Sequence, residues 1–244
     1  MENGSKRVAL VTGANKGIGL EIARQLGREQ IIVLVGARDA VRGEAAAGQL
    51  RSDGIDARFV HLDVTDTASI AQAAAAIGAS HGRLDILVNN AGIGDSADGA
   101  PGKADLTAVR RIFDTNFFGP LAVTQAMLPW LRKAPAARIV NMSSSLGSIA
   151  INGDATSPYY AVRLAGYNAS KAALNMLTVQ LAEELRDTLI VVNAACPGYV
   201  ATDLNGYSGP LTPQEAAATP VRLALLPDRE IHGQFISAQG PVRW

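Results

Sequence analysis

Short runs of aliphatic and β-branched residues alternate along the chain with longer stretches whose apolar positions recur at helical spacing. The short runs predict strands at residues 7–12, 31–37, 57–62, 84–89, 137–143, 190–196 and 233–237. The longer, often Ala-rich stretches predict helices at residues 16–28, 40–52, 67–81, 105–131 and 167–186. This alternation predicts an α/β fold with a doubly wound, Rossmann-type parallel sheet of about seven strands and helices on both faces. Such a sheet binds its ligand beyond the carboxyl ends of the strands.

Two stretches interrupt the alternation without dividing the chain. Residues 149–165 are rich in small and turn-forming residues, and residues 204–213 contain Gly206, Gly209 and Pro210. Both are expected to be loops or short helices at the ligand-binding edge, where they are candidates for shaping a substrate pocket, the second as a substrate loop. No Pro/Gly-rich linker separates two parts of the sequence. We therefore predict a single domain over residues 1–244.

Composition and charge exclude several classes of partner. The 244 residues carry 22 Lys and Arg against 22 Asp and Glu, so the basic excess typical of nucleic-acid binders is absent. Cys196 is the only cysteine, which indicates a reducing compartment and a cytoplasmic protein. The start of the chain is polar, and the apolar run that follows, residues 8–11, is too short for a signal peptide or a membrane span. Three isolated histidines show no metal-ligand spacing, so no metal site is expected.

A glycine-rich turn follows the first predicted strand and opens the first helix. It reads Gly13-Ala14-Asn15-Lys16-Gly17-Ile18-Gly19. Glycine lets the backbone approach a pyrophosphate, and the helix N-terminus presents N–H groups and a positive dipole end to it. A glycine-rich turn without a ligand is the alternative, but the position at the first strand–helix junction favours a dinucleotide site.

The end of the second strand indicates which dinucleotide binds. An acidic residue there would favour NAD, but the sequence has Arg38 at that point. Arg38 and Lys16 together favour the phosphate of NADP, although both are also compatible with surface charges and the neighbouring Asp39 complicates the choice. After the third strand, Asp63 and Val64 are placed either to bracket the adenine or, in the case of Asp63, to cap a helix.

Tyr167 and Lys171 are the most informative pair. Four residues apart on a predicted helix, they share one face. A phenol is a weak acid–base catalyst at neutral pH, and a nearby ammonium lowers its pKa into a useful range. The pair taken alone is equally compatible with an ordinary helical Tyr and Lys.

These motifs occur together and in order with several others. Asn89-Asn90-Ala91-Gly92 follows the fourth strand, Asn116 lies in a long helix, three serines at 143–145 follow the fifth strand, and Pro197-Gly198 follows the sixth. From about residue 8 to residue 244, the chain resembles the classical short-chain dehydrogenase/reductase family. Asn15-Lys16 and Ala37-Arg38-Asp39 are most similar to its NADP-dependent carbonyl reductase branch.

The resemblance implies a reversible, NADPH-dependent reduction of a ketone or aldehyde to an alcohol. The implied catalytic set is Asn116, Ser144, Tyr167 and Lys171. In this set Ser144 would polarise the substrate oxygen, and Tyr167 would transfer the proton. Lys171 would lower the pKa of Tyr167 and bind the ribose, and Asn116 would hold a water that connects Lys171 to solvent. The implied NADP(H)-binding set is Gly13, Asn15, Lys16, Gly17, Ile18, Gly19, Arg38, Asp63, Val64, Asn90, Ala91, Gly92, Tyr167, Lys171, Pro197, Gly198, Val200 and Thr202.

Alternatives remain for individual residues. Ser143 and Ser145 are the rivals of Ser144, and Asn116 is also compatible with a packing or capping amide. Asn90 is equally suited to stabilising the sheet, and Cys196 is read as a buried strand residue rather than a nucleophile.

One departure from the family pattern concerns the segment before Tyr167, which follows Ser144 by 23 residues. The carbonyl reductase branch also inserts residues here and thereby covers a helix face used for oligomerisation, so the resemblance implies a monomer. A catalytically idle NADP(H)-sensing protein is the alternative function, but the whole catalytic set is present. A sugar-nucleotide epimerase or dehydratase would bring a longer substrate portion.

Overall fold

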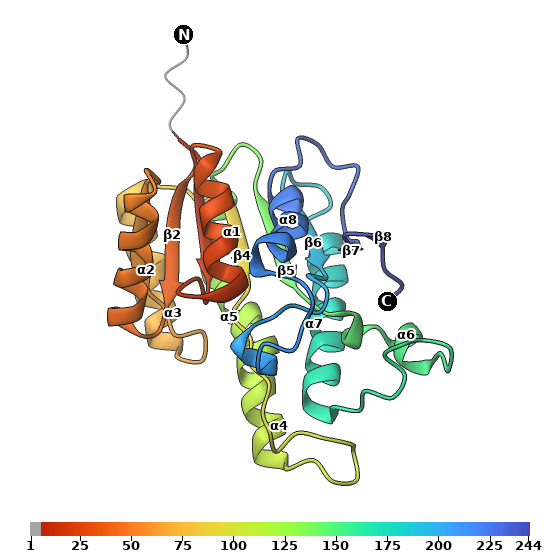
Figure 1. Ribbon diagram of the computed structural model, residues 1–244. Helices are drawn as coiled ribbons and strands as arrows, with labels where there is room; N and C mark the ends of the chain where they lie inside the picture. The colour runs from red at the N-terminus through yellow and green to blue at the C-terminus, as the bar shows by residue number, and fades with distance from the viewer. Residues whose placement is uncertain (1–5) are drawn as a thin grey trace.

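The structure, a computed structural model, describes residues 6–244 and is built around one eight-stranded sheet (Figure 1). The strands are β1 (Val8–Thr12), β2 (Ile32–Ala37), β3 (Ala57–His61), β4 (Ile86–Asn89), β5 (Arg138–Met142), β6 (Val191–Ala195), β7 (Phe235–Ser237) and β8 (Gly240–Pro241). Their order is β3-β2-β1-β4-β5-β6-β7-β8, with every neighbouring pair parallel except β7 and β8. The predicted α/β fold with a doubly wound parallel sheet is confirmed.

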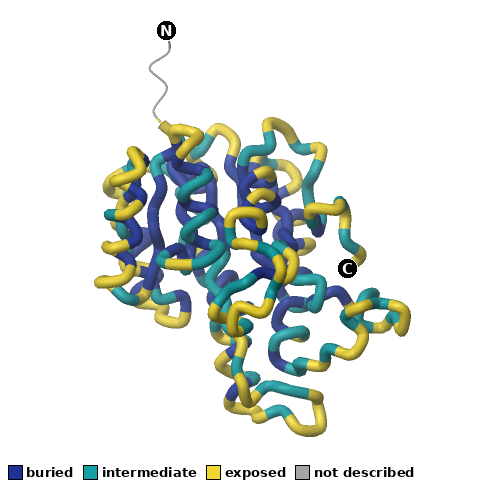
Figure 2. Tube along the Cα trace, viewed as in Figure 1, coloured by how far each residue is buried: buried dark blue, intermediate teal, exposed yellow. Residues whose placement is uncertain are grey.

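Helices cover both faces of the sheet. They are α1 (Gly17–Arg28), α2 (Ala40–Ser52), α3 (Thr67–His81), α4 (Leu106–Phe113), α5 (Gly119–Leu131), α6 (Ile149–Gly153), α7 (Ala165–Glu184) and α8 (Pro213–Ala224). One buried cluster joins the sheet to α1, α2 and α8, and a second joins it to α3, α5 and α7. Figure 2 shows the result, with the strands buried and the outer helix faces exposed.

The alternation of side chains in β1 shows how the sequence builds both cores. Ala9 and Val11 belong to the cluster with α1, whereas Val8 and Leu10 belong to the cluster with α3 and α5. All four are buried, because a central parallel strand has helices on both sides. This explains why the strands appear in the sequence as continuous apolar runs.

Three elements differ from the sequence predictions. The helix predicted over 105–131 is two helices, α4 and α5, joined by a π-helical turn at Asp114–Phe118 that contains Asn116. Helix α8 was not predicted, although Thr212 and Glu215 form a capping box and Pro213 occupies its first turn. Strand β8 was not predicted either. The second turn-rich stretch extends to Thr212, as expected, and holds a 3-10 turn at Asp203–Asn205.

Two predicted absences concern the part of the chain that the structure describes. Within residues 6–244, no helix has the length and apolar character needed to cross a membrane. The same residues contain no group of three or more His, Cys, Asp or Glu side chains arranged to hold a metal ion. The polar start of the chain, residues 1–5, lies outside the described residues.

Candidate active site

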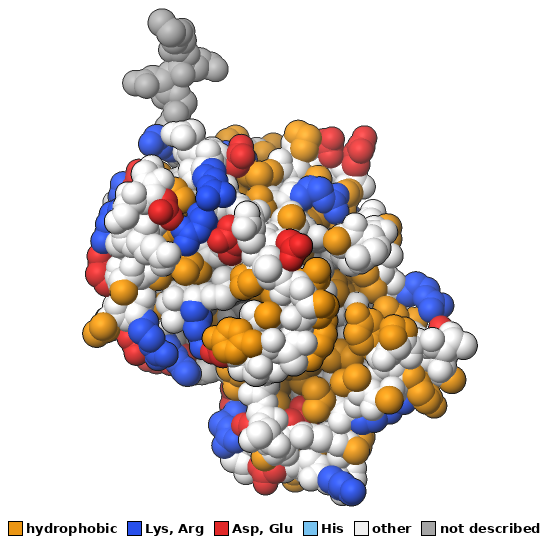
Figure 3. All heavy atoms as spheres, in the orientation of Figure 1, with side chains coloured by type: hydrophobic (Ala, Val, Ile, Leu, Met, Phe, Trp, Pro, Cys, Tyr) orange, Lys and Arg blue, Asp and Glu red, His pale blue; other side chains and the backbone are white. Residues whose placement is uncertain are grey.

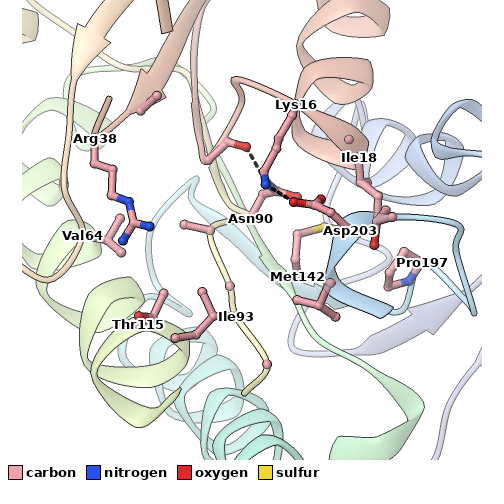
Figure 4. Close-up of a pocket in the computed structure, with 18 of the residues that line it drawn as sticks. Lys16, Ile18, Arg38, Val64, Asn90, Ile93, Thr115, Met142, Pro197 and Asp203 are labelled. Atoms are coloured by element: carbon pink, nitrogen blue, oxygen red, sulfur yellow. Dashed lines mark hydrogen bonds and ion pairs between the residues drawn. The ribbon is translucent and has the colours of Figure 1, made fainter. Parts of the chain in front are cut away.

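A cavity of about 400 Å³ opens at the carboxyl ends of the strands. It lies where β1 and β4 are neighbours although β2 and β3 separate them in sequence, and at such a point the crossovers leave in opposite directions. Its walls come from the segments that follow β1, β2, β3, β4, β5 and β6 (Figure 4). Six strand ends far apart in the sequence thus meet around one space.

The glycine-rich turn forms one wall of the cavity. Gly13 and Gly17 have positive φ angles of 64° and 55°, a backbone conformation that favours glycine. Lys16 precedes α1 without a side-chain cap, and the first turn of α1 has no acidic residue. The N-terminal N–H groups of α1 therefore suit an anionic ligand.

Close packing requires glycine at position 19. A Cβ atom at this position would lie 2.4 Å from Nδ2 of Asn90 and 2.6 Å from the Gly13 carbonyl oxygen. Asn90 in turn donates to the Thr12 carbonyl oxygen at 2.8 Å, which ties the ends of β1 and β4 together. Asn90 also lines the cavity, so its sheet-stabilising role and a ligand contact are compatible.

Two cationic side chains reach the cavity from different elements (Figure 4). Arg38 comes from the end of β2, and Lys16 comes from the glycine turn, where it forms an ion pair with Asp203. Asp39, which complicated the sequence argument, is the N-cap of α2 and pairs with Arg42, with Nε and Oδ2 3.0 Å apart. Asp39 is therefore engaged with its own helix.

Asp63 lines the cavity, and the N-cap of α3 is Asp66. The Asp63 carboxylate accepts hydrogen bonds from the backbone N–H and the hydroxyl of Thr65, at 2.9 and 2.7 Å. Burial alone would raise the pKa of Asp63, but these bonds and nearby Arg38 outweigh burial and hold that pKa below its ordinary value. The carboxylate thus stays charged at the cavity wall, and the capping alternative for Asp63 is wrong.

The three serines after β5 point in three directions. The Ser143 hydroxyl donates to Asn175 at 2.5 Å, and the Ser145 hydroxyl lies 3.2 Å from Sγ of Cys196. The Ser144 hydroxyl accepts from the Leu146 N–H at 3.2 Å and lies close enough to the Tyr167 phenol to lower the pKa of that phenol. Of the three hydroxyls, that of Ser144 is therefore the one held beside Tyr167.

Tyr167 and Lys171 lie one turn apart on α7, and both line the cavity. Lys171 Nζ donates to the Met142 carbonyl oxygen at 2.7 Å and lies 5.7 Å from the centroid of the Tyr167 ring. Burial raises the pKa of Tyr167 to about 12, opposed by the Ser144 hydrogen bond, and lowers the pKa of Lys171 to about 8. Both side chains are thus biased towards their neutral forms.

Asn116 is fully buried in the π-helical turn. Its Nδ2 donates to the Ile93 carbonyl oxygen at 3.0 Å and to Ser170 Oγ at 3.1 Å, while its Oδ1 accepts from the Ile93 N–H at 2.8 Å. A Cβ atom on Gly92 would lie 3.4 Å from this Oδ1 and 3.5 Å from Lys171 Nζ. The Asn116 side chain is therefore held by three hydrogen bonds, and its Oδ1 borders the same space as Lys171 Nζ.

Most predicted cofactor residues lie in the cavity wall, and some do not. The wall contains Gly13, Lys16, Gly17, Ile18, Arg38, Asp63, Val64, Asn90, Ala91, Gly92, Tyr167, Lys171, Pro197 and Thr202. It does not contain Asn15, Gly19, Gly198 or Val200. Val200 is buried in a bridge with Leu211, and Gly198 packs against the same leucine.

Several further wall residues were not predicted from the sequence, namely Ala37, Leu62, Thr65, Ile93, Gly94, Thr115, Met142 and Asp203, whereas Ser143 was a rival of Ser144 and Leu204 belongs to the predicted substrate loop. Most are small or apolar and carry no chemical signal of their own. Their position directly after a predicted strand was the available signal, since the carboxyl ends of parallel strands meet at one edge.

The segment before Tyr167 is fastened to the start of α7. Asn168 donates to Asn152 Oδ1 and to the Val162 carbonyl oxygen, both at 3.0 Å. Further along α7, Met176 and Val179 are 57% and 38% exposed, so the segment leaves this part of the helix uncovered. The predicted monomer stays a prediction.

Comparison with known proteins gives a consistent picture. A family model described as "short chain dehydrogenase" matches residues 7–210. Carbonyl reductase [NADPH] 1 of Sus scrofa is 36% identical, over 98% of this chain and 94% of that protein, and (-)-isopiperitenone reductase of Mentha piperita is 36% identical over 94% and 96%. Among solved structures, the NADPH-bound carbonyl reductase from chicken fatty liver superposes with a TM-score of 0.86 at 32% identity, covering 98% of this chain and 99% of that one.

Proposed function

Because the chain belongs to the short-chain dehydrogenase/reductase family, we propose that it reduces a ketone or an aldehyde to an alcohol with NADPH, in a reversible reaction. The observation that carries the proposal is that Tyr167 and Lys171 line the cavity, one turn apart on α7, and that the Ser144 hydroxyl lies beside the Tyr167 phenol. These residues come from two segments more than twenty positions apart, and the hydroxyl of Ser144 lowers the pKa of the Tyr167 phenol, against the effect of burial.

The cavity fits a phosphorylated dinucleotide. The positive φ angles of Gly13 and Gly17 and the uncapped start of α1 suit a pyrophosphate, and Arg38 and Lys16 suit the additional phosphate of NADP(H). Gly92 leaves room beside Lys171 Nζ for the ribose hydroxyls. When bound, the nicotinamide supplies the hydride.

The side chains of the protein supply the proton that the substrate oxygen receives. Ser144 donates a hydrogen bond to the substrate oxygen and polarises the carbonyl. Tyr167 gives its phenolic proton to that oxygen, and the ammonium of Lys171 stabilises the phenolate that remains. Asn116 Oδ1 has a second lone pair beside Lys171, where it holds a water that returns a proton from solvent.

An apolar organic carbonyl compound suits the surroundings of the site. In Figure 3, hydrophobic side chains gather on the face that carries α6, α7 and the segment after β6. Ile149, Tyr199 and Leu204 are exposed there, and Leu204 also lines the cavity. The relatives named as carbonyl reductases support the same substrate class.

The test follows NADPH and NADH oxidation with a panel of ketones and aldehydes. The Tyr167→Phe variant should lose about 10²- to 10⁴-fold in kcat, because it removes the proton donor and keeps the ring. Tyr160→Phe is the matched control, since Tyr160 lies outside the cavity wall and its ring packs against Arg163. No turnover with any panel member, or full activity of Tyr167→Phe, would overturn the proposal.

A further inference from the structure

Helix α7 carries Tyr167 in its first turn but has no cap from its own sequence. Leu164 is the N-cap residue and makes no side-chain hydrogen bond, and the first turn contains no acidic residue. The bond from the Asn168 N–H to the Leu164 carbonyl oxygen is within the helix. The N–H groups of Ala165, Gly166 and Tyr167 precede it, and they need acceptors from elsewhere.

The loop between β4 and α4 supplies all three acceptors. The Gly99 carbonyl oxygen accepts from the Ala165 N–H at 2.8 Å. The two carboxylate oxygens of Asp98 accept from Gly166 and from Tyr167, each at 2.8 Å. In Figure 1 this loop reaches the end of α7 from which the helix begins. A carboxylate at this end also interacts favourably with the helix dipole.

The contact is close because residue 166 is glycine. A Cβ atom there would lie 2.9 Å from Ile112 Cδ1 and 3.2 Å from Asp98 Oδ2. Any side chain before Tyr167 would therefore push the loop and α4 away from the start of α7. The fit between Asp98 and Gly166 has little room for displacement.

We infer that Asp98 is a positioning residue for the proposed reaction, on which this inference rests. Its carboxylate fixes the backbone of Tyr167, so that the phenol stays in register with Ser144. Lys171 is held independently, by the Met142 carbonyl oxygen. Asp98 thus governs the placement of the phenol and leaves the cofactor contacts of Lys16, Arg38 and Lys171 in place.

The same loop is anchored at its other end beside the cavity. The Ile93 N–H and carbonyl oxygen are both bound by the Asn116 side chain. Ser170 links Asn116 to the Tyr167 carbonyl oxygen, through bonds of 3.1 and 2.8 Å. The backbone of Tyr167 is therefore held at its N–H by Asp98 and at its carbonyl through Ser170.

The experiment compares Asp98→Asn with Asp95→Asn. The amide introduced by Asp98→Asn would keep one acceptor oxygen and turn an NH₂ group towards the second N–H. Asp95, in the same loop, pairs instead with Arg111 at 2.5 Å and lies outside the cavity wall. Asp98→Asn should lower kcat by about 10- to 100-fold, measured per NADPH-binding site, because a small misplacement of a reacting group costs this much. KM and the NADPH dissociation constant should stay within about twofold of the parent values.

Hydrogen exchange supplies a second readout. Amide exchange at residues 165–167 should be faster in Asp98→Asn than in the parent, and unchanged in Asp95→Asn. Faster exchange with an unchanged kcat would reject the positioning role. An equal loss of kcat in Asp95→Asn would reject it too, since the effect would then belong to the loop as a whole.

Two further results keep the inference separate from the proposed function. If the parent reduces no carbonyl compound, the proposed function fails and takes the positioning role with it. If the parent is active but Asp98→Asn does not fold, Gly166→Ala tests the same contact from α7. A loss of kcat at unchanged NADPH affinity in Gly166→Ala would support the inference, and parental kcat would overturn it.

Discussion

At the scale of single residues, burial acts in opposite directions on the two ionisable groups that α7 places in the cavity. Desolvation disfavours the charged form, so the pKa of Tyr167 rises to about 12 and that of Lys171 falls to about 8. Lys171 is therefore protonated below about pH 8 and loses its charge as the pH rises through this value. In the proposed reduction, that charge stabilises the phenolate.

We expect kcat for carbonyl reduction to fall as the pH rises above about 8, because a neutral Lys171 no longer assists proton release from Tyr167. The measurement is a pH–rate profile with saturating NADPH and substrate. NADPH affinity measured over the same range separates this effect from a loss of cofactor. A rate that stays level to about pH 10 would mean that the charge of Lys171 does not assist the reaction.

The ion pair between Lys16 and Asp203 leads to a second prediction at this scale. Both side chains are about half exposed and line the cavity, so Asp203 competes with a ligand phosphate for the same cation. Asp203→Asn should therefore tighten NADPH binding by about two- to fivefold, the range expected for an exposed ion pair. NADH, which lacks the additional phosphate, should gain less.

Fluorescence titration of both cofactors measures this difference. Asp187→Asn is the control, since Asp187 is highly exposed, pairs with Arg186 and lies outside the cavity wall. Weaker NADPH binding in Asp203→Asn would show that the carboxylate assists the cofactor instead of competing with it.

At the scale of elements, the turn that carries Ser144 is packed directly against α7. A Cβ atom on Gly147 would lie 2.7 Å from both the carbonyl carbon and the Cβ of Lys171, and the Asn175 side chain donates to the Gly147 carbonyl oxygen at 3.2 Å. Backbone atoms cannot move aside as a side chain can. The distance between Ser144 and Tyr167 thus depends on a glycine that takes part in no chemistry.

Gly147→Ala should lower the free energy of unfolding by about 1–3 kcal/mol, because overpacking forces the turn away from α7. It should also lower kcat, since Ser144 moves with the turn. Gly153→Ala is the matched control, because a Cβ atom there meets nothing within 4 Å. Denaturant unfolding and steady-state kinetics on both variants make the comparison, and equal stability of the two would contradict the packing argument.

The strands and helices also show which parts of the fold the sequence could predict. The strands were predictable because each is buried on both faces, and the cavity edge followed from the strand ends. Helix α8 was missed because the turn-forming residues before it mask the capping box at Thr212 and Glu215. The contact of Asp98 with α7 was beyond prediction, since 68 and 69 residues separate the partners and no local pattern marks it.

The choice among the three serines could not be made from the sequence for a similar reason. Adjacent residues after a strand point in different directions, and the bonds of Ser143 to Asn175 and of Ser145 to Cys196 connect distant parts of the chain. Likewise, the sequence could place Asn116 in a helix but could not show that a π-helical turn directs its amide to Ile93.

At the scale of the whole molecule, the cavity joins the two halves of the sheet. Its wall takes residues from the ends of β1, β2 and β3 on one side and of β4, β5 and β6 on the other. A ligand that binds this wall binds the folded state alone, because the wall does not exist in the unfolded chain. Cofactor binding is therefore linked to the stability of the whole fold.

NADPH at about a hundred times its dissociation constant should stabilise the protein by about 2.7 kcal/mol. For a chain of this size, that corresponds to a rise of about 5–10 °C in Tm. NADH at the same concentration should give a smaller rise, because Arg38 and Lys16 then have no additional phosphate to bind. Thermal unfolding with each cofactor measures both shifts.

Charge reversal at Arg38 tests the origin of this difference. Arg38→Asp should reduce the rise in Tm that NADPH causes, to or below the rise that NADH causes. The reason is that a carboxylate at the end of β2 repels the additional phosphate and accepts hydrogen bonds from the ribose hydroxyls. Arg28→Asp is the control, since Arg28 lies in the last turn of α1, away from the turn that lines the cavity. A parent protein stabilised equally by NADH and NADPH would remove the basis for NADP(H) as the cofactor, while the fold and the Ser144–Tyr167–Lys171 arrangement would stand unchanged.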